Sequence, residues 1–184
     1  MIVLSCVGDG RKISLVKGRK PNKFYSCLRL CSQSVALEKN LQFSEYDFLE
    51  RGADERQYAS PHVSLDVGTL CNTKFSEYPE YHTSADDMKI ISEEALAMTA
   101  EIVLRTIFFF NKNERILVKD PCEPMFSKFG IYPHTRNYTS TKKTVMNLLN
   151  FTAYSDGENY LSDIAEICSI SDIEALEYLH LFKH

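Results

Sequence analysis

The chain has 184 residues, of which 21 are basic and 25 acidic, so its formal net charge at pH 7 is −4. That length is enough for one domain, or for one domain and a small appendage. With 44% hydrophobic and 11% aromatic residues the chain can bury a sizeable core, which excludes intrinsic disorder. Its mild acidity excludes a general nucleic-acid coat, because such a protein needs a strong basic excess.

A membrane span and a structural zinc site are also excluded by the sequence. The longest strongly apolar run, 102–110, is interrupted by Arg105, whereas a membrane-spanning helix needs about 20 apolar residues. The six cysteines are spread along the chain. Cys27 and Cys31 stand four residues apart on a predicted helix, but no second Cys/His pair follows at zinc-site spacing. We therefore expect reduced thiols in a cytoplasmic protein.

Four short strands are predicted, all before residue 119. The continuous apolar run Ile2–Val7 predicts a buried strand that ends at a Gly-Asp-Gly turn. Lys12–Val16 alternates polar and apolar residues, which is typical of an exposed strand. Leu65–Leu70 and Ile116–Val118 are further candidates.

Helices are predicted on both sides of a proline-punctuated stretch. The first runs from Asn22 to about Glu38, and a second from Ser92, a good N-cap, to Phe110. Three more follow in the last third of the chain, at Thr141–Tyr154, Leu161–Cys168 and Asp172–Phe182. These elements predict an α/β body over 1–118, a connector over 119–139 and a helical tail over 140–184.

Two polar loops of the body, Phe43–Pro61 and Phe75–Asp87, are the candidate functional segments. Each lies between a strand candidate and another regular element, where α/β folds usually place their sites. Each mixes acidic residues with Arg, Gln, Tyr or His instead of the Lys/Glu mixture of a solvated face. A neutral imidazole at His82 could bind a metal. The alternative is a solvated loop with an ordinary structural histidine.

Specific segments in these loops resemble zinc aminopeptidases. His82 to Asp86 resembles the His-Thr-x-x-Asp segment of the co-catalytic enzymes, whose histidine is a metal ligand. Together, the two loops look most like those of aminopeptidase-like proteins of bacterial polysaccharide gene clusters. Their Glu-Tyr-Pro-Glu-Tyr-His-Thr-Ser segment is matched without a mismatch by residues 77–84, and their Gly-Ser-Asp-Glu-Arg-Gln loop by residues 52–57, with Ala53 in place of Ser. Residues 6–9 resemble a strand-end segment of the same family.

The resemblance implies a fold and a set of site residues. The fold would be part of a zinc-exopeptidase-like three-layer α/β/α body, followed by a truncated, winged-helix-like appendage. His82 would be one zinc ligand and Asp9 a second, with Cys6 as the rival of Asp9 because thiolate also binds zinc. The residues implied to bind substrate or to orient the ligands are Asp54, Glu55, Arg56, Gln57, Tyr81 and Asp86.

The resemblance also implies that parts of such a site are missing. Family members carry a first His, a bridging Asp and a general-base Glu upstream of the segment that resembles Ile2–Asp9, with which this chain begins. We therefore expect no peptidase activity from this chain alone, and either pairing with a missing N-terminal half or self-association. The substrate of the intact family would be a peptide or another amide. The alternatives are a non-catalytic binding or regulatory module and a non-functional product of a split gene.

The tail has the helix–turn–helix pattern of a DNA reader but the wrong charge for one. Residues 150–184 contain one basic and seven acidic residues, a net charge of −6. DNA readers meet phosphates with Lys and Arg. We therefore expect no DNA binding and favour a packing or protein-contact role for the tail.

Overall fold

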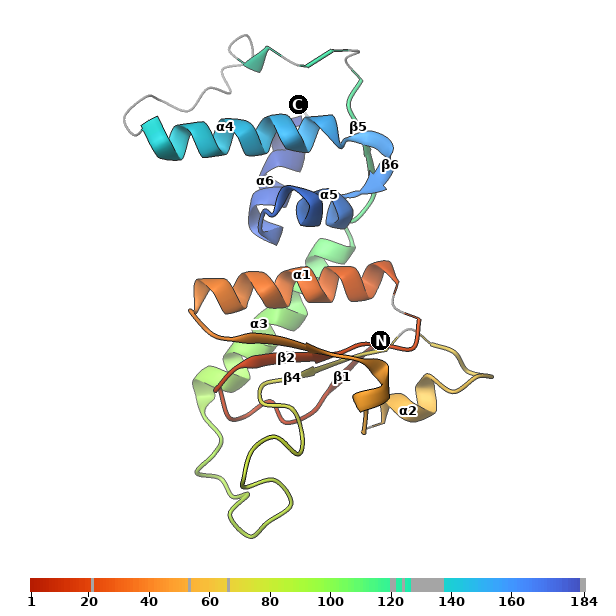
Figure 1. Ribbon diagram of the computed structural model, residues 1–184, viewed down its shortest axis with the longest axis vertical. Helices are drawn as coiled ribbons and strands as arrows, with labels where there is room; N and C mark the ends of the chain where they lie inside the picture. The colour runs from red at the N-terminus through yellow and green to blue at the C-terminus, as the bar shows by residue number, and fades with distance from the viewer. Residues whose placement is uncertain are drawn as a thin grey trace. The chain divides into compact units, whose positions relative to one another are not determined.

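The computed structural model describes residues 1–20, 22–52, 54–65, 67–119, 122–123, 125–126 and 138–182. The chain divides into two units, Met1–Phe110 and Asn111–His184 (Figure 1). The sequence predicts the end of the body at residue 118, whereas β5 (Arg115–Leu117) pairs antiparallel with β6 (Asp156–Tyr160) inside the second unit. Most of the predicted connector 119–139 lies outside the described residues.

A four-stranded mixed sheet in the order β1-β4-β2-β3 forms the first unit's centre. β1 (Ile2–Leu4) runs parallel to β4 (Gly68–Cys71), which is antiparallel to β2 (Ile13–Val16). β2 in turn runs parallel to β3 (Phe43–Tyr46). The carboxyl ends of β1 and β4 therefore meet at one end of the sheet, beside the start of β2.

The burial of two strands is the reverse of the prediction. β1 is shorter than the predicted Ile2–Val7 and is an edge strand, half-buried at Ile2 and Val3 and exposed at Leu4. β2 was predicted to be exposed, yet all four of its residues are buried, because it lies between β4 and β3 and both of its faces are covered. Ser14 is fully buried despite its hydroxyl. Alternation in the sequence therefore does not report solvent exposure here.

Two long helices, α1 (Lys23–Glu38) and α3 (Glu93–Phe110), cover one face of this sheet (Figure 1). Both agree with the predicted helices. The side chain of Asn22 caps α1 by accepting a hydrogen bond from Phe24 N at 2.8 Å. The core between helices and sheet consists of Ile13, Leu15, Tyr25, Leu28, Val35, Ala36, Leu70, Met98 and Ile102.

The opposite face of the sheet is covered mainly by loops. Val16 and Cys71 pack there against Phe75, from the loop that follows β4. The Phe75 ring lies so near Gly52 that an added Cβ would stand 2.9 Å from it. The predicted irregular segment 43–61 contains β3, a short 3₁₀ helix at Phe48–Glu50 and α2 (Glu55–Tyr58). The α/β fold is confirmed, and the two candidate functional loops lie on the face of the sheet opposite the two long helices.

The second unit is a small helical domain with a two-stranded sheet. Its helices are α4 (Tyr138–Ala153), α5 (Leu161–Cys168) and α6 (Asp172–Phe182). The fully buried Phe151 ring packs edge-on against Tyr178 at 5.6 Å and stacks on Phe182 at 6.0 Å. α5 and α6 have the predicted bounds, whereas β6 was not predicted. Among the described residues, no helix has the length and hydropathy needed to cross a membrane.

Candidate functional site

The connections that follow β1 and β4 are joined at the carboxyl ends of these two strands. Asn72, just after β4, donates a backbone N–H to Cys6 O and a side-chain N–H to Val7 O, each at 2.9 Å. Its side-chain oxygen faces the Thr99 hydroxyl of α3 at 3.4 Å. Because Asn72 is completely buried, these bonds fix the position of the connection that carries Cys6 and Asp9.

Asp9 is held rigidly by Thr73. One carboxylate oxygen accepts the Thr73 N–H at 2.9 Å, and the other accepts the Thr73 hydroxyl. The side chain is only 5% exposed, and Arg11 Nε lies 3.8 Å from its Oδ2. A carboxylate oxygen can accept more than one hydrogen bond or ligand, so Asp9 is preorganised and still able to bind a cation.

Cys6 lies in the same connection and is half-buried, with a left-handed backbone φ of 52°. Tyr78 OH donates a hydrogen bond to its Sγ at 3.5 Å. Burial and this hydrogen bond raise the pKa of Tyr78 well above its ordinary value. The neighbouring Cys71 is fully buried, and burial, with the nearby Cys6 and Glu55, raises its pKa to about 12. Cys71 is therefore a neutral thiol and a poor metal ligand.

His82 is exposed, with a left-handed φ of 58°. Its imidazole stacks on the ring of Tyr81 at 4.0 Å, and Tyr81 in turn meets Tyr78 edge-on at 5.5 Å. The part of the chain that the structure describes contains no group of three or more His, Cys, Asp or Glu residues able to hold a metal ion. His82 and Asp9 therefore do not by themselves make a zinc centre of the usual four-coordinate kind.

The remaining predicted site residues differ in their surroundings. Glu55 is 1% exposed, and its carboxylate accepts a hydrogen bond from Gly52 N at 2.9 Å, which fixes the turn before α2. Asp54, Arg56 and Gln57 are exposed around it. Asp86 is also exposed, and no hydrogen bond joins it to His82 within the described ranges. Of this group, only Glu55 is buried.

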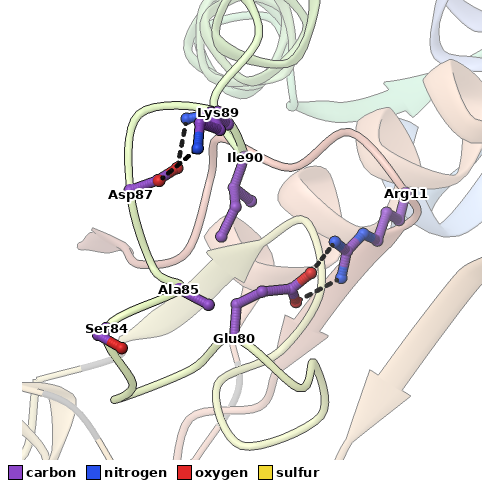
Figure 2. Close-up of a pocket in the computed structure, with 7 residues that line it drawn as sticks. All are labelled: Arg11, Glu80, Ser84, Ala85, Asp87, Lys89 and Ile90. Atoms are coloured by element: carbon purple, nitrogen blue, oxygen red, sulfur yellow. Dashed lines mark hydrogen bonds and ion pairs between the residues drawn. The ribbon is translucent and has the colours of Figure 1, made fainter.

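The sequence did not single out Arg11 and Glu80, which tie the β1 connection to the His82 loop. The Arg11 guanidinium donates two hydrogen bonds to the Glu80 carboxylate, at 3.1 and 2.9 Å (Figure 2). This pairing raises the pKa of Arg11 and lowers that of Glu80. The two residues are 69 positions apart, so no local pattern could have indicated their contact.

A second missed cluster lies between β2, β3 and the same loop. Lys12 Nζ donates to Tyr46 OH at 2.8 Å and to Glu77 at 2.6 Å, while Tyr46 OH donates to Glu77 at 2.6 Å. Lys74, only 9% exposed, holds its ammonium over the rings of Tyr46 and Phe75 at 4.9 and 4.8 Å. Glu77 and Glu80 both belong to the eight-residue segment 77–84, so that segment anchors the loop at two points.

Comparison with known proteins links both units to described families. Residues 1–113 match a family described as a domain of unknown function (DUF4910), and residues 115–181 match a winged helix-turn-helix family. A candidate polysaccharide biosynthesis protein with an aminopeptidase-like domain, from Clostridium acetobutylicum, is 32% identical over 169 residues, which are 89% of this chain and 37% of that protein. The crystal structure of a candidate peptidase from Clostridium acetobutylicum superposes with a TM-score of 0.75 at 24% identity, over 97% of this chain and 39% of that one.

Proposed function

The chain belongs to the DUF4910 family and continues into a winged helix-turn-helix domain, and we propose that its first unit is the C-terminal part of an aminopeptidase-like hydrolase domain. The relatives are peptidase-like, and the chain spans little more than a third of their length, 37% and 39%. The observation that carries the proposal is the fixed Asp9 carboxylate, bound by Thr73 and linked through Arg11 and Glu80 to the loop of His82.

In the proposed domain, this chain supplies part of the site. His82 and Asp9 are its two candidate zinc ligands, with Cys6 as the rival of Asp9, since its thiol lies in the same connection. Zinc would polarise a scissile carbonyl and activate water. Two ligands are too few for such a site. Zinc would therefore bind only in the larger domain, and His82 and Asp9 alone would carry out no zinc chemistry.

Two surfaces of the first unit, the edge of β1 and an exposed face of α3, support the proposal that a further part of the domain packs against this unit. Within the described sheet, no strand pairs with the outer edge of β1, and Leu4 at that edge is exposed. α3 also exposes Leu104 and Phe108, at 67% and 58%. Free edges and contiguous apolar surface mark interaction sites. We assign both to contact with the rest of an aminopeptidase-like domain, and self-association is the competing outcome.

The proposed substrate is a peptide or another amide made or trimmed in polysaccharide biosynthesis. The substrate class rests on the name of the Clostridium acetobutylicum relative, with its aminopeptidase-like domain. A cytoplasmic location is supported by the six cysteines, all of which are free thiols.

The experiment is hydrolysis of aminoacyl p-nitroanilides by the 184-residue chain with added zinc. We expect no turnover above the zinc-only background, because the described residues supply two ligands at most. Metal analysis after dialysis should give much less than one zinc per chain, for wild type and for His82→Ala alike. Glu177→Gln, an exposed change in the second unit, is the matched control.

Two outcomes would contradict the proposal that this chain supplies only part of the site. Robust turnover that His82→Ala abolishes would mean that this chain carries a complete peptidase site. Stoichiometric zinc that survives His82→Ala and Asp9→Asn would mean that the metal ligands lie elsewhere.

A further inference from the structure

A pocket lies beside the connection that carries Asp9, and most of its lining residues have no part in the proposed peptidase role (Figure 2). Its volume is about 590 Å³, within the usual size range of small-molecule sites. Arg11 lines it from the connection before β2, and the loop after β4 contributes the rest of the lining: Glu80, Ser84, Ala85, Asp87, Lys89 and Ile90. The pocket therefore opens where two connections at the carboxyl ends of β1 and β4 meet, a common place for ligands in α/β folds.

The charges that line the pocket neutralise one another. Arg11 pairs with Glu80 through two hydrogen bonds, and Lys89 Nζ lies 3.5 Å from the Asp87 carboxylate. An anionic ligand would meet two carboxylates, and a cationic ligand would meet two cations. The lining therefore favours a ligand without net charge.

Hydrogen-bonding groups of both kinds are still available in this lining. A guanidinium has five N–H donors, of which Glu80 takes two, and each carboxylate oxygen can accept a further bond. Ser84 is exposed, and its hydroxyl makes no hydrogen bond within the described part of the chain. Donors and acceptors in one lining suit hydroxyl groups, because each hydroxyl donates one hydrogen bond and accepts others. Ala85 and Ile90 add apolar surface for the C–H face of a ring.

We propose that this pocket binds a neutral, hydroxyl-bearing small molecule of the size of one sugar residue. The inference goes beyond the peptidase role, since it rests on the pocket's own charges and hydrogen-bonding groups and needs neither zinc nor hydrolysis. It adds to the molecule a carbohydrate subsite lined by Arg11, from the connection that also carries Asp9.

The test is an NMR titration of the ¹⁵N-labelled 184-residue chain with three matched sugars. N-acetyl-D-glucosamine is neutral, D-glucosamine carries an ammonium group, and D-glucuronate carries a carboxylate. We expect the neutral sugar to bind at millimolar concentration and to shift amide signals of residues 80–90. The two charged sugars should bind more weakly.

Variants of the lining make the test specific. Ser84→Ala and Asp87→Asn change exposed side chains, so the spectrum should keep its native dispersion. Each should weaken binding of N-acetyl-D-glucosamine up to about tenfold, because each removes or weakens one hydrogen bond to the ligand. Glu177→Gln should bind as wild type does.

Three results would overturn the proposal: no shift of residues 80–90 with the neutral sugar, tighter binding of either charged sugar, or binding unchanged in both lining variants. None of these depends on peptide hydrolysis, so a failure here leaves the proposed peptidase role standing.

Discussion

Glu77 joins the loop that follows β4 to two other parts of the first unit. Its carboxylate accepts hydrogen bonds from Lys12 and Tyr46, both at 2.6 Å, and so ties the His82 loop to β2 and β3. Burial acts to raise the pKa of Glu77, but the hydrogen bonds from Lys12 and Tyr46 outweigh it and the pKa is lowered. The same contacts raise the pKa of Lys12 against the opposing effect of burial.

A lowered carboxyl pKa makes stability depend on pH with a defined sign. The contribution of Glu77 is fully present above its unfolded pKa, near 4.3, and is lost as pH falls through its lower folded pKa. Glu77→Gln should therefore lower the free energy of unfolding by about 1 kcal/mol at neutral pH, and by progressively less in acid. Urea denaturation at several pH values measures the difference.

The matched control for this pH series is Glu177→Gln, whose side chain is exposed on α6. It should leave the pH dependence of unfolding as in wild type. A Glu77→Gln deficit that stays constant down to strongly acidic pH would show that the charge of Glu77 does not stabilise the fold.

At the residue scale, the sequence indicated the candidate functional segments, but it did not indicate which side chains contact one another. Residues 77–84 were recognisable because the whole segment matches a known pattern. The partners of its carboxylates, Arg11 and Lys12, come from a connection more than 60 residues away, with sequence separations of 69 and 65. Such contacts arise only once β2 lies beside β4, and no local spacing encodes them.

At the scale of elements, the packing of α1 against the sheet depends on a glycine at the start of β4. A Cβ added to Gly68 would lie 2.9 Å from Tyr25 Cδ2 and 3.0 Å from Leu28 Cδ2. Both side chains belong to the buried core between α1 and the sheet. The helix therefore rests directly on the backbone of β4 at this point.

Gly68→Ala should destabilise the protein by about 1–3 kcal/mol, because buried Tyr25 and Leu28 must shift to admit the methyl group. Denaturant unfolding followed by tyrosine fluorescence or circular dichroism measures this loss. Gly8→Ala is the matched control, since its added Cβ would lie 3.0 Å from Cγ1 of Ile91, whose side chain is exposed and not packed in the core. Equal losses of unfolding free energy in Gly68→Ala and Gly8→Ala would mean that α1 is not tightly packed on the backbone of β4.

The helices were predictable and the strands only partly so, for a physical reason. α1, α5 and α6 match their predicted bounds to within one residue, because their apolar spacing and their caps are encoded locally. β6 was missed because residues such as Asp156-Gly157-Glu158 have low strand propensity, and β3 because Phe43–Tyr46 opens a charged segment without a longer strand pattern. These strands form because a partner strand, β2 or β5, offers them a ladder of hydrogen bonds.

At the scale of the whole molecule, charge is divided unevenly along the chain. The net charge of −4 is the result of +2 on residues 1–149 and −6 on residues 150–184. The acidic stretch contains α5 and α6, the helix–turn–helix of the winged-helix match. In DNA readers of this type the second helix enters the major groove, where it needs donors and positive charge.

α6 lacks the groups that this role requires. Its acidic and basic side chains are Asp172, Glu174, Glu177 and His180, and Glu166 is exposed on α5 before it. We therefore expect no complex tighter than about 0.1 mM with double-stranded DNA at physiological salt, in mobility-shift or fluorescence-anisotropy assays. A tight complex that weakens steeply with added salt would contradict this expectation.

A charge-reversal variant separates the effect of charge from that of shape. Glu166→Lys with Glu177→Lys changes two exposed side chains and makes the segment less acidic by four charges, without touching the buried Phe151 core. If the helix–turn–helix has a DNA-compatible shape and only its charge prevents binding, the double variant should gain weak, salt-sensitive affinity. If it gains none, the shape of this unit is also unsuited to DNA, and its surface is better explained as a contact for protein.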